Sequence, residues 1–119
     1  MGYYRDLTVW QKAMDLVVLI YELTRLFPKE ETYALISQMR RAAISIPSNI
    51  AEGQRRKSQK DFCHFLDIAY GSGAELETHI EIAKRLGYAQ NNFYQGVEDI
   101  LIEVMKMLNT LISTLRTTN

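Results

Sequence analysis

The chain has 119 residues, of which 47% are hydrophobic and 24% charged, and its 14 lysines and arginines balance its 14 aspartates and glutamates. This length fits one domain, residues 1–119, with a sizeable core. Zero net charge argues against a protein that coats RNA through general basicity.

Location is predicted from cysteine usage and from apolar runs. Cys63 is the single cysteine, which excludes an internal disulfide and suits a reducing cytoplasm. The first residues lack the apolar region of a signal peptide, and the longest apolar run, Leu16 to Tyr21, is too short to span a membrane. We therefore expect a cytoplasmic protein without membrane contact.

Apolar periodicity predicts a first helix from about Thr8 to Phe27. Thr8 and Gln11 have the spacing of a capping box, and the residue before Pro28 avoids helical geometry. The predicted inward stripe consists of Trp10, Met14, Val17, Tyr21 and Thr24.

The second helix is expected from a cap at Thr32 to Gln54, with Gly53 helping it to end. Its predicted inward stripe consists of Leu35, Met39, Ala42, Ile46 and Ile50. Pro47 cannot donate a hydrogen bond inside this helix, which predicts a kink. A break into two helices at Ile46 is the alternative, because proline also suits a first helical turn.

Two polar residues follow Pro47 within about a turn. Asn49 is predicted to be mostly buried and to bond to backbone near the kink, a structural role rather than a catalytic one. Glu52 is predicted to pair with a neighbouring arginine.

A third helix is expected between a cap at Ser58 and a stop at Gly87. Its stripe consists of Phe62, Phe65, Leu66, Ala69, Gly73, Leu76, Ile80 and Ala83. A fourth helix follows a cap at Asn91 or Asn92, with a heptad stripe of Val97, Leu101, Val104, Leu108, Leu111 and Leu115. Short connections then predict an all-α fold, an antiparallel up-down-up-down four-helix bundle with a Pro-kinked second helix.

The helices carry more apolar surface than one bundle needs. Leu16 to Tyr21 covers every direction of the first helix, which would leave Leu16 and Leu19 or Val18 outward. Ile100, Met107 and Ile112 lie beside the heptad stripe. A broad monomer core is one explanation. We favour a homo-oligomer formed through the first and fourth helices, since large exposed apolar patches are rare in monomers.

Gly71 and Gly73 stand inside the third helix, where each costs about 1 kcal/mol relative to alanine. They indicate either the close approach of another backbone or a kink.

The block Ser45-Ile-Pro-Ser-Asn-Ile-Ala-Glu-Gly53, with Gly71-Ser72 through Glu75-Leu76-Glu77, carries a family resemblance. Over essentially its whole length the chain resembles the bacterial four-helix-bundle proteins encoded in intervening sequences of large-subunit ribosomal RNA genes. The resemblance implies a ring-like homo-oligomer, typically a pentamer. A related branch acts beside the reverse transcriptase of diversity-generating retroelements and binds nucleic acid. The partners implied are therefore RNA or DNA and a protein such as a reverse transcriptase.

Charges are unevenly distributed despite their balance. An up-down bundle brings the second connection to the same end as both termini, and the predicted cations there are Arg5, Arg55, Arg56, Lys57, Lys60 and Arg116, against Asp6 and Asp61. The first amides of the third helix, near Ser58, add an anion site. We expect RNA or DNA phosphates to bind there, with Tyr3 or Tyr4 stacking on bases. The alternative is a solvated loop with salt bridges between neighbours.

Few residues suggest an enzyme. Glu75 and His79 are four apart, whereas di-metal bundles use a three-residue spacing on two helices. Asp61, His64 and Asp67 could share a face, but it would be wet. We expect no metal, no cofactor and no catalysis. Two hypotheses remain: an oligomer bound to nucleic acid, which we favour, and a structural protein–protein adaptor that binds none.

Overall fold

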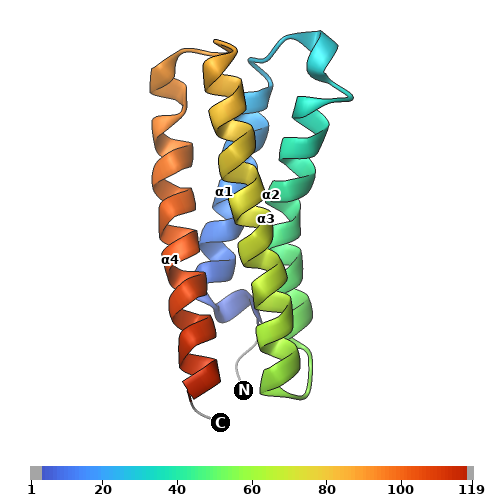
Figure 1. Cartoon of the computed structure of the whole chain (residues 1–119), viewed down its shortest axis with the longest axis vertical. Coiled ribbons are helices and arrows are strands. Elements are labelled where there is room, and N and C mark those ends of the chain that lie inside the picture. Colours follow the sequence, from blue (N-terminus) through green and yellow to red (C-terminus); the bar gives the residue numbers. More distant parts are fainter. Residues whose placement is uncertain (1–3, 118–119) are drawn as a thin grey trace.

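The computed structural model describes residues 4–117 and contains four α-helices: α1 (Thr8–Thr24), α2 (Leu35–Gln54), α3 (Gln59–Arg85) and α4 (Gln95–Thr117) (Figure 1). Three single-turn 3-10 helices precede α1, α2 and α4: η1 (Tyr4–Asp6), η2 (Lys29–Glu31) and η3 (Asn91–Phe93). Residues 4–117 contain no strand, so the prediction of an all-α, four-helix fold is confirmed.

The four helices lie side by side in a bundle of 47 × 23 × 21 Å (Figure 1). The start of α1, the α2–α3 connection and the end of α4 share one end, here named the terminal end. The α1–α2 and α3–α4 connections share the other, the distal end. None of the helices in residues 4–117 is long and apolar enough to cross a membrane.

Helix α2 continues without a break through Pro47, whose side chain is buried, so the alternative of two helices divided at Ile46 is wrong. A kink at Pro47 stays a prediction. Gly53 is a buried residue inside α2 rather than a stop signal beyond it. A β-carbon added there would lie 2.8 Å from Cβ of Phe65 and 2.9 Å from Cδ1 of Phe62. Glycine therefore allows α2 and α3 to pack closely.

Two predicted boundaries of α3 are confirmed. Ser58 caps the helix, because its Oγ accepts a hydrogen bond of 3.1 Å from the amide of Asp61. Gly87 ends the helical run with a φ of 75°, a left-handed conformation that suits glycine. The amide of Tyr88 then donates to the carbonyl of Ala83 at 3.0 Å and closes the helix end.

The other predicted caps are wrong. Thr8 is the first residue of α1 rather than its cap, and Gln11 Nε2 donates instead to the carbonyl of Arg5 at 2.9 Å. Thr32 precedes α2, which begins at Leu35. Asn91 and Asn92 form η3, before α4 begins at Gln95. A 3-10 helix takes the predicted cap residues only at α4, while Thr32 follows the 3-10 helix η2 and Thr8 lies inside α1.

The buried stripes of α2 and α3 agree with the periodicity, except that Phe65 is half-buried. Helix α1 is rotated from its predicted orientation. Its buried residues are Val9, Ala13, Leu16, Ile20, Leu23 and Thr24. Leu16 is therefore buried in the core and not outward, while Val18 is 56% exposed. In α4, Ile112 is buried and Leu111 and Leu115 are half-buried, so the heptad stripe shifts near its end.

The two α3 glycines differ in their surroundings. A β-carbon on Gly73 would clash with Sδ of Met105 in α4, so a flexible side chain, and not a backbone, approaches there. Gly71 is exposed and has nothing within 4 Å of such an atom.

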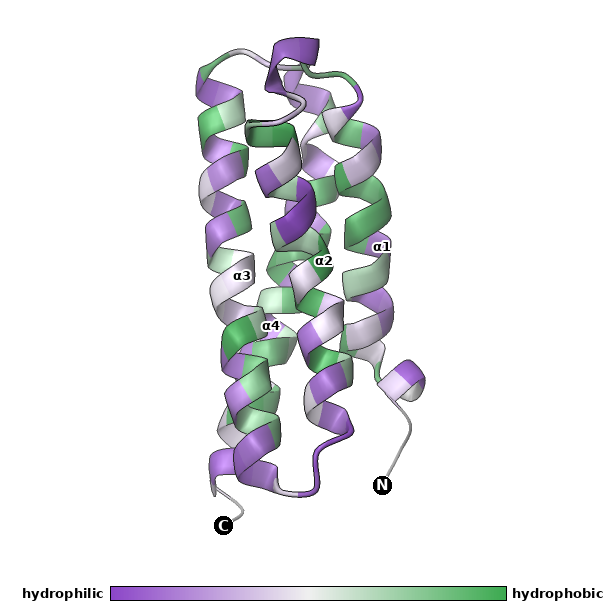
Figure 2. Ribbon diagram, turned by 90° about the vertical axis from the view of Figure 1, so that its right-hand side faces the viewer, coloured by the Kyte–Doolittle hydropathy of each residue, from purple (hydrophilic) through white to green (hydrophobic). Residues whose placement is uncertain are grey.

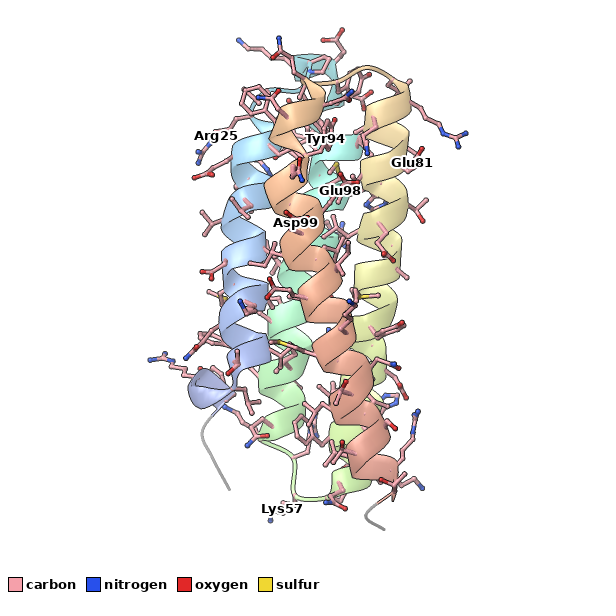
Figure 3. The ribbon with its side chains drawn as sticks, turned by 90° about the vertical axis from the view of Figure 1, so that its left-hand side faces the viewer. Arg25, Lys57, Glu81, Tyr94, Glu98 and Asp99 are labelled. Carbon is pink, nitrogen blue, oxygen red and sulfur yellow. The ribbon has the colours of Figure 1, made fainter. Side chains whose placement is uncertain are left out.

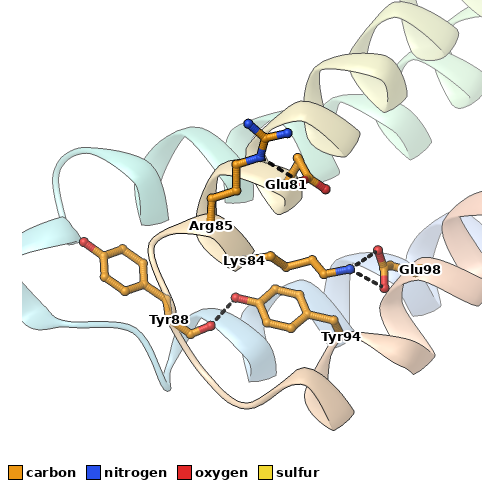
Figure 4. Close-up of polar contacts among 6 residues, drawn as sticks. All are labelled: Glu81, Lys84, Arg85, Tyr88, Tyr94 and Glu98. Atoms are coloured by element: carbon orange, nitrogen blue, oxygen red, sulfur yellow. Dashed lines mark hydrogen bonds and ion pairs between the residues drawn. The ribbon is translucent and has the colours of Figure 1, made fainter.

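Polar contacts at the distal end involve Tyr94, Tyr88, Lys84 and Glu98 (Figure 4), and Tyr88 also reaches the α1–α2 connection. The buried Tyr94 donates its hydroxyl hydrogen to the carbonyl of Tyr88, and Lys84 pairs with Glu98 at 3.1 Å. Tyr88 in turn donates to Oε2 of Glu31 in η2 at 2.7 Å. Burial, with a smaller effect of the Glu98 carboxylate, raises the pKa of Tyr94 to about 12.

Gly53→Ala should lower the free energy of unfolding by about 1–3 kcal/mol, because the root of a packed Phe65 side chain cannot rotate away from the new methyl group. Gly71→Ala is the matched control, and it should stabilise the protein by about 1 kcal/mol, since that site is open. Chemical denaturation of both variants measures the difference. Equal stability of the two variants would contradict the close contact.

Tyr94 should make stability fall at high pH. A folded pKa above the unfolded value means that the folded state holds its proton more tightly, so the stabilisation is complete below the ordinary value of 10.0 and is lost as the pH rises towards about 12. Over this interval the wild type should lose up to about 2 kcal/mol more stability than Tyr94→Phe. Denaturant unfolding at a series of pH values tests this, and parallel pH curves for the two proteins would count against it.

Candidate nucleic-acid interface

Six predicted cations lie at the terminal end, and all six are exposed. We name this set the basic end, and it consists of Arg5, Arg55, Arg56, Lys57, Lys60 and Arg116. Figure 3 shows Lys57 at the extreme of the terminal end, far from Tyr94 at the distal end. The α2–α3 connection that carries the central cations is hydrophilic (Figure 2).

The local fold explains why cations follow α2. Arg55 is the C-cap of this helix, and the amide of Arg56 donates to the carbonyl of Gly53 at 3.1 Å. A helix C-terminus carries a partial negative charge that attracts cations. Lys57 instead lies next to a helix N-terminus, directly before Ser58 and the partially positive start of α3. The helix dipoles therefore favour the two arginines but give no reason for Lys57.

Intramolecular pairs neutralise part of the basic end. Arg56 forms an ion pair with Glu52 at 2.8 Å, as predicted, and its guanidinium carbon lies 4.8 Å from the ring centre of Phe65. Arg116 pairs with Asp67 across α3 and α4. These contacts match the alternative of neighbouring salt bridges. Within residues 4–117, Lys57 and Lys60 take part in no ion pair, so their charges face solvent.

An aromatic pair lies beside the basic end. The guanidinium carbon of Arg55 is 5.2 Å from the ring centre of Tyr4, a cation–π distance. Tyr4 packs edge-to-face on Trp10, with ring centres 5.3 Å apart. Trp10 was predicted as a core residue but is only half-buried. Tyr3, the other predicted stacking residue, lies outside the residues that the structure describes.

Amides at the start of α3 face the same end of the molecule. Ser58 Oγ accepts a hydrogen bond from the amide of Asp61. The Ser58 carbonyl accepts one from the amide of Phe62 at 3.1 Å. The amides of Gln59 and Lys60 belong to the first turn, where helical acceptors are lacking. They can donate to an anion, although the exposed Asp61 carboxylate in the same turn weakens this attraction.

The residues around Pro47 form a polar link between α2 and α3. Asn49 Nδ2 donates to the carbonyl of Ser45 at 2.8 Å and to its Oγ at 2.9 Å, so the predicted bond to backbone is present. Asn49 is half-buried rather than mostly buried. Ser72 in α3 donates to the same Oγ at 2.8 Å, a hydrogen bond that the sequence did not predict. The two serines are 27 residues apart, so no local sequence pattern could have indicated this bond.

The residues considered for metal binding are used in other ways. In residues 4–117 no three histidine, cysteine, aspartate or glutamate side chains gather in a possible metal site. Asp67 pairs with Arg116, and His64 packs edge-to-face on Phe65. His79 is buried, with its Nε2 3.5 Å from a carboxylate oxygen of Glu75.

The sequence profile of the 23S rRNA-intervening sequence proteins matches residues 5–110. A crystal structure of a protein of unknown function from the S23 ribosomal protein family of Bacteroides thetaiotaomicron has a similar fold, with a TM-score of 0.81 and 27% identity. The match covers 88% of this chain and 95% of the other. No curated protein matches the chain.

Asn49→Ala should lower the free energy of unfolding by about 1 kcal/mol, near the lower limit of the cost of an unsatisfied buried group, because the site is only half-buried. Ser72→Ala, which removes the other donor to Ser45 Oγ, should cost less, since it leaves the Ser45 carbonyl bonded. Thermal melting of the two variants tests this order. An unchanged melting temperature for Asn49→Ala would rule out a structural role of this amide.

Proposed function

The chain belongs to the 23S rRNA-intervening sequence protein family, and we propose that it acts in the cytoplasm as a non-enzymatic homo-oligomer whose basic end binds RNA or DNA. The observation that carries this proposal is the gathering of six exposed cations at the terminal end, where α3 begins. Phosphates attract such a patch even when the net charge of the protein is zero, because nearby charges dominate the local field.

Stability alone does not explain the position of the lysines. Lys57 and Lys60 flank the start of α3, where the helix dipole disfavours cations. Neither is neutralised by a carboxylate within the described part of the chain. A phosphate bound between these lysines and the first amides of α3 would neutralise the lysine charges and accept hydrogen bonds from the amides. This binding would be weak and largely independent of base sequence.

The proposed assembly uses α1 and α4 of an antiparallel, up-down-up-down bundle with a kink at Pro47. Val18 is exposed on α1, and α4 has a groove of about 360 Å³ that includes Met107 and Leu111. Covering these residues would remove apolar surface from water. The family resemblance suggests five subunits. A ring would repeat the basic end around one rim, so that a long strand could contact several copies at once.

Arg55→Gln/Arg56→Gln/Lys57→Gln should reduce the binding of a generic single-stranded oligonucleotide and flatten its log–log salt dependence by roughly 0.7 for each phosphate that the variant no longer neutralises. The control is Arg25→Gln/Lys29→Gln/Arg85→Gln, which removes the same charge from the distal end. Fluorescence anisotropy at several salt concentrations measures both. Unchanged binding by the first variant, or no binding by the wild type at low salt, would refute the proposal and leave the adaptor role.

Light scattering coupled to size exclusion tests the assembly separately. We expect a mass close to five times the 13.8 kDa subunit, and Val18→Glu should reduce it, because a charge would enter the proposed interface. A subunit mass at micromolar concentration would contradict the homo-oligomer. The family resemblance also suggests a protein partner such as a reverse transcriptase, which would bind independently of the three cations if it used another face.

A further inference from the structure

An open apolar groove lies between α1 and α2 next to the basic end. It has a volume of about 350 Å³, and its lining includes Tyr4, Trp10, Met14, Val17, Ile44 and Pro47. Met14 and Ile44 are each 41% exposed, so the groove is accessible in the subunit. Its volume falls in the range of small-ligand pockets, roughly 300–1,000 Å³.

We propose that this groove receives an unstacked base of single-stranded RNA or DNA whose backbone lies on the basic end. This inference rests on the proposed function and adds a preference for single strands. A base has apolar faces that stack on aromatic rings, while its own strand supplies the negative charge. The groove offers the aromatic surface of Trp10 and Tyr4 at the point where the cations begin.

The charges around the groove favour a polyanion. Among the described residues, none that lines the groove is charged, and two arginines lie over Tyr4 at its mouth. The guanidinium carbons of Arg55 and Arg5 lie 5.2 and 5.9 Å from the Tyr4 ring centre. Each arginine can keep its aromatic contact and still donate to a phosphate, because the guanidinium edge carries five N–H groups. Phosphate and base would then be held by adjacent parts of one surface.

The geometry also explains why the ligand must be single-stranded. In a duplex the bases are stacked inward, so an aromatic groove beside the backbone cannot reach a base face without unpairing it. A single strand offers its bases at little cost. Ser48, which is exposed at the groove, can bond to the edge of any base, so no strong sequence preference is expected.

Trp10 is the only tryptophan, so its fluorescence reports on the groove directly. The experiment titrates the protein with a 20-nucleotide single strand and with the duplex of the same sequence, and records anisotropy of a labelled strand and emission of Trp10. We expect the single strand to bind at least about fivefold more tightly and to quench Trp10, because only the single strand can stack a base on the ring. The duplex should bind without quenching.

Two matched variants locate the effect. Ile44→Glu places a carboxylate in the groove, and Ile82→Glu places the same charge at 43% exposure on α3. Ile44→Glu should abolish quenching and weaken single-strand binding about tenfold, while Ile82→Glu should keep both. Circular dichroism checks that each variant is folded, and the wild-type comparison of single strand with duplex needs no variant.

The outcomes separate this inference from the proposed function. Equal affinity for single strand and duplex with unchanged Trp10 emission would overturn the groove inference but leave phosphate binding by the basic end. No binding at low salt would overturn both. Emission that changes with protein concentration alone, without nucleic acid, would show a second copy of the chain in the groove and would also overturn the inference.

Discussion

Gly53 has room for a hydrogen and not for a methyl group, and this contact of α2 with Phe62 and Phe65 of α3 positions the features on which the proposals depend. Because the helices meet so closely at their ends, the chain must reverse over residues 55–58. That short connection places the end of one helix, the start of the next and three consecutive cations at one point. A longer or looser connection would spread the same charges.

Some cations near this connection are held in ion pairs, and others are available to bind a ligand. Glu52 holds Arg56 in an ion pair at the end of α2, and Asp67 of α3 holds Arg116 of α4. Exposed pairs of this kind stabilise proteins little, with a median of about 0–1 kcal/mol, so a phosphate could compete for the arginines. Among the described residues, no carboxylate has to be displaced before a phosphate binds Lys57, Lys60 or Arg55. The basic end can therefore attract polyanions although the whole chain is neutral.

The sequence was sufficient where the pattern had one interpretation. In α2 and α3 the apolar residues fall on one face among polar ones, so periodicity predicted the buried faces of both helices. The Ser58 cap and the Gly87 stop of α3 were also predicted. In α1 the run Leu16 to Tyr21 is apolar all round, so periodicity could not select the inward face, and the groove beside Trp10 was missed. The cluster of cations was predictable from topology. The Arg55–Tyr4 contact, the link from Ser72 to Ser45 and the purpose of Gly53 were not, because each joins residues far apart in sequence.

In the proposed complex, nucleic acid contacts the terminal end of the bundle through the α2–α3 connection. Photochemical cross-linking of a single-stranded oligonucleotide to the wild-type protein, with the modified peptides identified by mass spectrometry, tests it most directly. We expect cross-links on peptides that contain residues 55–60 and on the peptide that contains Trp10. Cross-links confined to the distal end, around Tyr33, Phe93 or Tyr94, would contradict it.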